Sequence, residues 1–257
     1  MSRPSVREGV SDAYVMARRG LTETVRKPTL LVFTFVEPVI LILIFRYAFG
    51  GAIQTPNGSY VNFLLPGILV LTAIFGAIVT GIGLSEDLSK GIVDRLRSLP
   101  IARSAVLVGR TVSDLARNVG SVILTLGVGY VVGFRPSEPV GRVVAAIALL
   151  LAFAYVFSWI AATIGLLVRD PETAQGAGFV WVFPLTFVSS AFVPTHTMPH
   201  VVRALADVNP VTLCVDAVRA LTIGGHATSA VLGTLAWLAG LLLVFVPFAV
   251  ARYRALE

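Results

Sequence analysis

Glu37 carries the most deeply placed charge in the apolar part of this sequence, within Phe35-Val36-Glu37-Pro38. An ionised side chain in the middle of a bilayer costs about 2.5–3.5 kcal/mol on insertion scales, so such a carboxylate should face other helices or a wet cavity. Two roles are open for it. Glu37 can contact a cationic or polar substrate, or it can make a hydrogen bond between helices beside the kink that Pro38 imposes.

Motifs for nucleotide binding and for hydrolysis within a membrane are absent from the sequence. A Walker A loop needs Gly-x-x-x-x-Gly-Lys-Ser/Thr, and the nearest fragment, 88–91, has neither the glycines nor the order. There is no His-Glu-x-x-His pair and no Gly-x-Ser-x-Gly elbow, and His196, His200 and His226 read as solvated loop residues. Cys214 is the only cysteine and reads as a packing residue. We therefore predict no catalytic residue, no metal site and no cofactor bound by this chain.

The elements that position these residues are six apolar stretches, each long enough to cross a bilayer, which takes about 20 mostly apolar residues. They are residues 29–49, 61–85, 112–134, 143–168, 176–194 and 228–250, called spans one to six. The composition agrees, because 56% of the residues are hydrophobic and only 13% are charged. Asp114 and Arg117, at the start of span three, predict an interfacial ion pair. We predict an all-α polytopic membrane protein with six transmembrane helices, formed by residues 29–257.

The basic residues indicate how the spans are oriented. Fifteen of the 20 Lys and Arg residues lie before span one, between spans two and three or at the start of span three, or after spans four and six. The positive-inside rule therefore predicts that both termini are cytoplasmic. The basic residues do not form one patch interleaved with aromatic residues, so we predict that the chain does not bind nucleic acid. Its surroundings are predicted to be a lipid bilayer. The first 28 residues lack the apolar core of a removable signal peptide.

Two amphipathic segments are predicted on the cytoplasmic side. In the first segment, residues 1–28, an apolar stripe faces a charged one, which favours a helix lying at the inner membrane surface over an ordinary solvated helix. The second segment begins at Glu86 and is ended by Pro100, and its apolar stripe consists of Leu88, Ile92, Leu96 and Leu99. Such a helix can dock a soluble partner, or it can cap the bundle.

The loop between spans five and six predicts two short helices on the outer side of the membrane. They begin at Pro199 and Pro210, because proline is favoured at the first helical position. The second ends at Gly224-Gly225, a typical helix stop. Both are too short to cross a membrane but apolar enough to lie in it or re-enter it.

Several ordered motifs resemble the permease subunit of type-2 ABC exporters, and most closely the daunorubicin-resistance branch, which acts in multidrug efflux and antibiotic resistance. The similarity covers nearly the whole chain. The motifs are residues 169–175, 183–187, 191–194, 197–199, 209–212, 216–221 and 224–225, preceded by Glu86-Asp87 and by 95–100. One departure is Glu37, where the pattern of the family has an uncharged polar residue such as Gln before the proline.

The resemblance implies an assembly in a bacterial inner membrane. Two permease chains, identical or homologous, would pair above two nucleotide-binding subunits that hold ATP and Mg²⁺. It implies an N-terminal amphipathic interface helix, short outer re-entrant helices, and a coupling helix that rests on the ATPase subunit. The residues expected to couple to the ATPase are Glu86, Asp87, Lys90, Asp94, Arg95 and Arg97. The residues expected along the substrate path are Glu37, Phe183 and Phe187.

The function predicted from these observations is ATP-driven export of an amphipathic, drug-like molecule, with the ATP hydrolysed by a separate subunit. A lipid or a lipid-linked glycan is an alternative substrate. A passive channel or membrane scaffold is an alternative class of protein, and it would need no ATPase. A membrane enzyme would need acid, base or metal-ligand residues within the spans, and their absence argues against that class.

Overall fold

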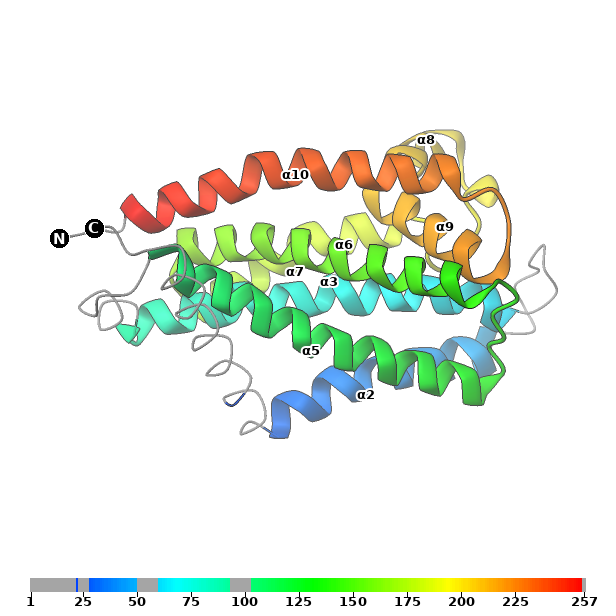
Figure 1. Ribbon diagram of the computed structural model, residues 1–257, viewed down its shortest axis with the longest axis horizontal. Helices are drawn as coiled ribbons and strands as arrows, with labels where there is room; N and C mark the ends of the chain where they lie inside the picture. The colour runs from blue at the N-terminus through cyan, green and yellow to red at the C-terminus, as the bar shows by residue number, and fades with distance from the viewer. Residues whose placement is uncertain (1–21, 23–27, 50–59, 93–102, 256–257) are drawn as a thin grey trace.

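The computed structural model describes residues 22, 28–49, 60–92 and 103–255, and every regular element in these ranges is a helix. Figure 1 shows the long helices along the longest axis of the molecule, with α10 on one side, α2 and α5 on the other, and α8 and α9 together at one end. The elements are α2 (Pro28–Ile44), η1 (Phe45–Phe49), α3 (Tyr60–Ser89), α5 (Arg103–Val132), α6 (Val140–Val168), α7 (Pro171–Phe187), η2 (Thr195–Thr197), α8 (His200–Val208), α9 (Pro210–Ile223) and α10 (Thr228–Ala255).

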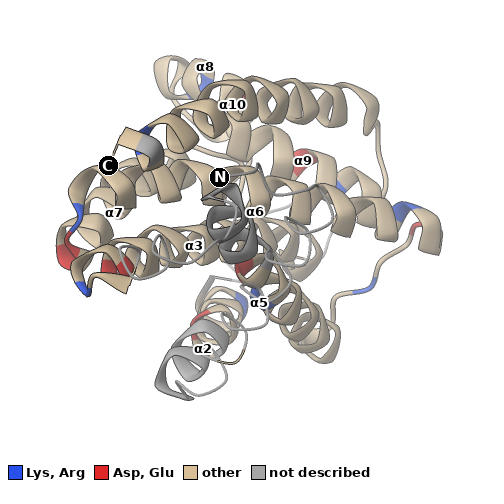
Figure 2. Ribbon diagram, turned by 60° about the vertical axis from the view of Figure 1, so that its left-hand side comes forward, with Lys and Arg blue, Asp and Glu red and all other residues tan. Residues whose placement is uncertain are grey.

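Four helices in the described part of the chain are long and apolar enough to cross a membrane: α3, the Ser113–Val132 part of α5, α6, and α10 as far as Tyr253. They correspond to predicted spans two, three, four and six. Figure 2 shows how little of the helical ribbon carries charge, since blue and red mark only short stretches of it. The chain is therefore a multi-pass, all-helical membrane protein. Helices α2 and α7 have 17 residues each, fewer than the roughly 20 of a straight span.

Helix α7 ends at Phe187, before the end of predicted span five at residue 194, and residues 188–193 form bends and turns. Pro184 lies inside the last turn of the helix and has no N–H to donate. Just after it, the Ser189 hydroxyl donates to the carbonyl of Thr186 and accepts from the N–H of Ala191. These local side-chain hydrogen bonds replace those that a continuing helix would make.

Helix α3 is the central element, and most of its residues are buried. Its closest neighbour is α6, because small residues let the two backbones approach. A Cβ atom added to Gly165 would lie 2.3 Å from the carbonyl oxygen of Gly81, and one added to Gly81 would lie 2.4 Å from that of Ala161. Such contact between backbones is a common way for membrane helices to pack, since lipid supplies no hydrophobic drive between them.

We expect Gly165→Ala to destabilise the protein, because the new methyl group cannot fit against the carbonyl of Gly81. Overpacking of this kind costs about 1–3 kcal/mol, so the midpoint of thermal unfolding in detergent should fall. Gly141→Ala in the same helix is the control, since an added Cβ there meets nothing within 4 Å. An unfolding midpoint for Gly165→Ala equal to that of Gly141→Ala would contradict the close packing of α3 on α6.

The ion pair predicted between Asp114 and Arg117 is present, and it lies buried where α5 packs against α3. Their side chains are only 5% and 4% exposed, and Arg117 Nη1 lies 2.8 Å from Asp114 Oδ1. Arg117 Nη2 also donates to the carbonyl of Gly76 in α3, at 2.9 Å. The buried polar residues around this pair define a polar seam of Thr80, Asp114, Arg117, Asn118 and Ser121. The spacing of the two residues does not indicate this burial, because it depends on how α5 packs against α3.

The first of the family-like motifs forms a tight corner between α6 and α7. Arg169 ends α6 with a φ of 59°, Asp170 caps α7, and Pro171 begins it. Asp170 Oδ2 accepts hydrogen bonds from the hydroxyl and the backbone N–H of Thr173, at 2.6 and 2.8 Å. Both bonds lower the pKa of the Asp170 carboxyl below its usual value, and the bond from the hydroxyl has the larger effect. The motif thus has a structural role, which is to turn the chain between α6 and α7.

The two short helices predicted after span five are confirmed as α8 and α9. Asn209 caps α9 and Pro210 begins it, and the chain turns away at Gly224 and Gly225, whose φ angles are 101° and 126°. Positive φ angles of this size are readily adopted only by glycine. Residues 1–21 and 23–27, which hold nearly all of the predicted N-terminal helix, lie outside the described residues.

Candidate functional site

Six phenylalanine side chains from different parts of the chain touch one another in a continuous series. The series runs from Phe45 in η1 through Phe192, Phe187, Phe183 and Phe179 to Phe75 in α3. Along this order the ring centroids are 4.6, 5.9, 5.7, 5.4 and 6.1 Å apart. Offset and tilted arrangements at these distances are the favourable geometries for aromatic pairs. We call these six side chains the phenylalanine series.

Part of the phenylalanine series lies open on the surface of the chain. The exposed fraction is 44% for Phe183 and 61% for Phe187. By contrast, Phe153 and Phe157 also stack, but they are fully buried in the core. The exposed rings of α7 therefore offer an apolar, flat surface that another molecule can cover.

Of the predicted substrate-path residues, Phe183 and Phe187 belong to this series and Glu37 does not. Glu37 is exposed on α2, eight residues before Phe45 in the same continuous stretch of helix. Sequence reasoning missed the other four rings. The spacing Phe179-x-x-x-Phe183-x-x-x-Phe187 puts three rings on one face of a helix and could have identified one of them. The contacts of Phe45, Phe75 and Phe192 depend on tertiary packing.

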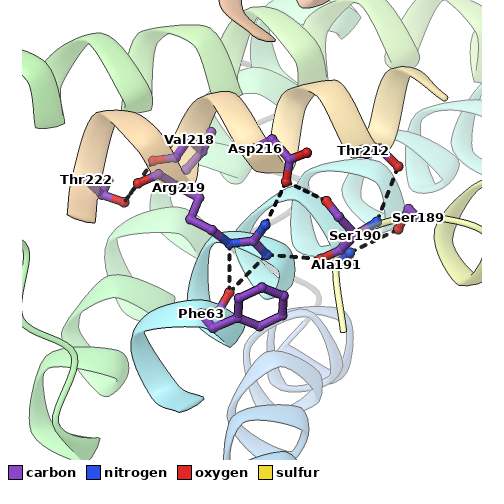
Figure 3. A network of polar contacts seen from close by, with 9 residues as sticks. All are labelled: Phe63, Ser189, Ser190, Ala191, Thr212, Asp216, Val218, Arg219 and Thr222. Atoms are coloured by element: carbon purple, nitrogen blue, oxygen red, sulfur yellow. Dashed lines mark hydrogen bonds and ion pairs between the residues drawn. The ribbon is translucent and has the colours of Figure 1, made fainter. Parts of the chain in front are cut away.

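A network of polar contacts lies where α9 meets the first turn of α3 and the turn after α7 (Figure 3). Its centre is Arg219 of α9. Arg219 Nη1 donates to Asp216 Oδ1 at 2.6 Å, Nη2 to the carbonyl of Ser190 at 3.0 Å, and Nε and Nη2 to that of Phe63 at 3.3 and 3.1 Å. The guanidinium carbon also lies 3.9 Å from the centroid of the Phe63 ring. We call this the Arg219 network.

Asp216 and Thr212 extend the Arg219 network along α9. The hydroxyl of Ser190 donates to Asp216 Oδ1 at 2.7 Å, and the backbone N–H of Ser190 donates to Thr212 Oγ1 at 3.2 Å. Ser190 therefore bonds to α9 through its hydroxyl, its N–H and its carbonyl. The turn that follows α7 is held to α9 by every polar group of this one residue.

Asn209 holds the start of α9 to the end of α7. Its amide nitrogen donates to the carbonyls of Leu185 and Val188, at 2.7 and 2.5 Å. Its Oδ1 accepts from the N–H of Val211 at 2.8 Å, which is the capping bond of α9. One buried side chain thus satisfies orphan groups at the end of one helix and at the start of the next.

Three of the six predicted ATPase-coupling residues, Glu86, Asp87 and Lys90, lie at the opposite end of α3. Glu86 and Asp87 belong to the last turn of α3, and Lys90 follows it and forms an ion pair with Glu86. The helix predicted to run from Glu86 to Pro100 is interrupted at Gly91, which has a φ of 64°. The other three predicted residues, Asp94, Arg95 and Arg97, lie outside the described residues.

Comparison with known proteins identifies the class to which this fold and site belong. The family model described as "ABC-2 type transporter" matches residues 12–223, and the chain belongs to this family. It is 33% identical over 252 residues to the daunorubicin resistance ABC transporter permease protein DrrB1 of Streptomyces coeruleorubidus, covering 98% of this chain and 89% of that protein. The predicted family is therefore confirmed.

More distant relatives span a similar share of the chain. The probable doxorubicin resistance ABC transporter permease protein DrrC of Mycobacterium tuberculosis is 25% identical over 256 residues, which cover 99% of this chain and 92% of that protein. The putative transport permease ycf38 of Porphyra purpurea is 24% identical over 218 residues, which cover 82% and 74% respectively. The relatives are named as permeases, the membrane subunits of ABC transporters.

Proposed function

We propose that this chain is the permease subunit of an ATP-driven exporter of amphipathic, drug-like molecules, and that the phenylalanine series lines the substrate path. The observation that carries this proposal is the exposure of Phe183 and Phe187 within a continuous series of rings. Flat aromatic molecules stack favourably on such rings, at about 0.5–1.5 kcal/mol beyond burial of apolar area. The drug-resistance permeases among the relatives support this substrate class.

The proposal includes a second permease chain, identical or homologous, facing the exposed sides of α2 and α7. Large apolar side chains are exposed along both: Val36, Ile40, Leu43 and Ile44 on α2 with Tyr47 on η1, and Val180, Phe183 and Phe187 on α7. The two sets come together where Phe45 stacks on Phe192, which in turn contacts Phe187. A partner here would turn an open surface into an enclosed path between two chains. Glu37, on the same helix as Val36, would suit a substrate with a positive charge.

In the proposed arrangement the chain crosses a bacterial inner membrane six times, with α2–η1 and α7 as the two additional spans and both termini in the cytoplasm. The α8–α9 pair then lies on the outer side and re-enters the outer leaflet. Exposed Val201, Leu205 and Val208 share one face of α8, as an amphipathic helix in a membrane interface requires. Two nucleotide-binding subunits, which bind ATP and Mg²⁺, sit at the cytoplasmic end.

The experiment that tests the proposal measures drug-stimulated ATP hydrolysis by the permease reconstituted with its ATPase subunits. We expect vanadate-sensitive hydrolysis that daunorubicin stimulates. Phe183→Ala and Phe187→Ala should each raise the half-maximal drug concentration about two- to tenfold, as the loss of one stacking contact implies. Basal hydrolysis should not change, because neither ring lies near the coupling end.

Phe248→Ala is the matched control, since Phe248 is an equally exposed ring on α10 and lies outside the series. The drug concentration for half-maximal stimulation should stay at the wild-type value in this variant. Equal effects of all three substitutions would count against a specific path. Stimulation by lipids but not by drugs would favour the second candidate substrate, a lipid or lipid-linked glycan, whose acyl chains the laterally open series can also accommodate.

A separate prediction concerns coupling at the far end of α3. The paired side chains of Glu86 and Lys90 are partly exposed there and can contact an ATPase subunit. Glu86→Lys should place two positive charges one helical turn apart and should reduce co-purification of the ATPase. Co-purification at the wild-type ratio, with normal drug stimulation, would remove Glu86 from the coupling surface. Arg142→Glu, which alters an exposed ion pair at the opposite end of the bundle, is the control.

A further inference from the structure

Arg219 joins three parts of the chain that are far apart in sequence. Through one guanidinium group it contacts the first turn of α3 at Phe63, the turn after α7 at Ser190, and Asp216 on its own helix. Phe63 is 156 residues away from it. Charge-assisted hydrogen bonds are about twice as strong as neutral ones, so this side chain largely determines how the three parts fit together.

The Arg219–Asp216 pair differs from the Asp114–Arg117 pair in its exposure. The Asp216 side chain is 44% exposed and that of Arg219 is 14% exposed, whereas both side chains of the Asp114–Arg117 pair are nearly fully buried. Separating a buried pair leaves an unpaired charge in a medium of low dielectric constant, which is costly. Separating Arg219 from Asp216 leaves the carboxylate in contact with its surroundings. Asp216 can therefore be separated from Arg219 at a lower cost than Asp114 from Arg117, while the largely buried Arg219 keeps its bond to the carbonyl of Phe63.

The Arg219 network also lies close in sequence to Phe192, the ring next to Phe45 in the phenylalanine series. Ser190, which Arg219 and Asp216 both contact, comes two residues before Phe192. Phe192 stacks on Phe45, and its carbonyl accepts a 3.5 Å hydrogen bond from the hydroxyl of Tyr60. Between them, the backbone of Ala191 packs against Gly67 so closely that a Cβ added to this glycine would lie 2.2 Å from the Ala191 carbonyl oxygen. Ser190 and Phe192 thus belong to one short segment that bonds to α9 at Ser190 and to α3 at Phe192.

We propose that Arg219 and Asp216 form a latch that holds Phe192 across the outer end of the substrate path, and that release of Ser190 from this latch lets the substrate leave. Arg219 and Asp216 are positioning residues in this scheme, since they act through Ser190 and Phe192. The inference rests on the proposed function, because it assigns the outer end of the path to the side where α9 lies.

The test locks the latch with a reversible cross-link. Ser190→Cys and Asp216→Cys are combined in a Cys214→Ala background, because the side chains that they replace are in hydrogen-bonding contact and Cys214 is the only native cysteine. A short bifunctional methanethiosulfonate reagent bridges the pair, and dithiothreitol reverses it. The readout is ATP-dependent daunorubicin uptake into inverted vesicles. Bridging should reduce uptake to the rate without ATP, basal hydrolysis should persist, and dithiothreitol should restore uptake.

The control pair is Arg203→Cys with Asp207→Cys, which replaces a more exposed ion pair within α8 and should transport normally when bridged. Unchanged uptake by the bridged 190–216 protein, with the cross-link verified by mass, would overturn the latch. Absence of uptake before any bridging, in the wild-type complex as well, would instead refute the proposed function.

A second variant tests the latch without a cross-link. Arg219→Gln keeps hydrogen-bond donors but loses the charge that holds Asp216, so the latch should release too readily. The number of drug molecules moved per ATP hydrolysed should then fall, while the drug concentration for half-maximal stimulation stays near the wild-type value. A purely structural role would lower the amount of folded complex and leave this ratio unchanged, which would overturn the proposal.

Discussion

Replacing Arg117 with methionine should destabilise the protein by about 3–5 kcal/mol, the typical cost of removing one partner from a buried ion pair. The substitution leaves the Asp114 carboxylate in the polar seam without its guanidinium partner. It also removes the 2.9 Å hydrogen bond from Arg117 to the carbonyl of Gly76, which ties α5 to α3. We expect most of the variant to be lost during purification in detergent. The surviving fraction should unfold at a clearly lower temperature than the wild type.

The double variant Asp114→Leu with Arg117→Met shows whether the cost comes from keeping the buried Asp114 charge without Arg117. Replacing a whole buried pair with apolar residues of similar volume is often close to neutral. The double variant should therefore recover most of the unfolding temperature lost by Arg117→Met. A double variant that is no more stable than the single one would mean that the seam depends on the guanidinium contact to Gly76 and not on charge balance.

The membrane helices could be predicted from the sequence because their cause is local. A run of about 20 apolar residues has to be helical in a bilayer wherever its neighbours lie. The short helices α8 and α9 were equally predictable, since Pro210 and Gly224 mark the ends of α9. The end of α7 was not, because its apolar run continues to Pro194 while Pro184 and Ser189 end the helix earlier.

The candidate site shows the limit of spacing as a guide. Asp114–Arg117 and Asp216–Arg219 are both acidic–basic pairs three residues apart, and the sequence alone makes them look alike. One is buried against α3, and the other is open enough for its carboxylate to be 44% exposed. The difference in exposure between the two pairs comes from tertiary packing alone. The same holds for the partner of Arg219 at Phe63, which no local pattern indicates.

Asn209→Ala should destabilise the protein by about 2.5–8 kcal/mol, since one side chain serves two helix ends. Loss of an N-cap costs about 0.5–2 kcal/mol, and each buried carbonyl left without a donor costs about 1–3 kcal/mol. The carbonyls concerned are those of Leu185 and Val188 at the end of α7. Without this contact, α9 and its Arg219 are no longer held in position against the turn that contains Ser190. Thermal unfolding in detergent measures the stability, and the drug-to-ATP ratio measures the effect on the latch.

Asn209→Asp separates the two roles of this residue, because aspartate keeps the acceptor for the N–H of Val211 but has no amide to donate. It also brings a negative charge close to two carbonyl oxygens. We therefore expect Asn209→Asp to be at least as destabilising as Asn209→Ala, although aspartate is as good an N-cap as asparagine. If Asn209→Asp unfolds at the wild-type temperature, capping of α9 alone explains the residue. The joint between α7 and α9 would then depend on Ser190 and the Arg219 network, and Arg219→Gln should show the larger loss of stability.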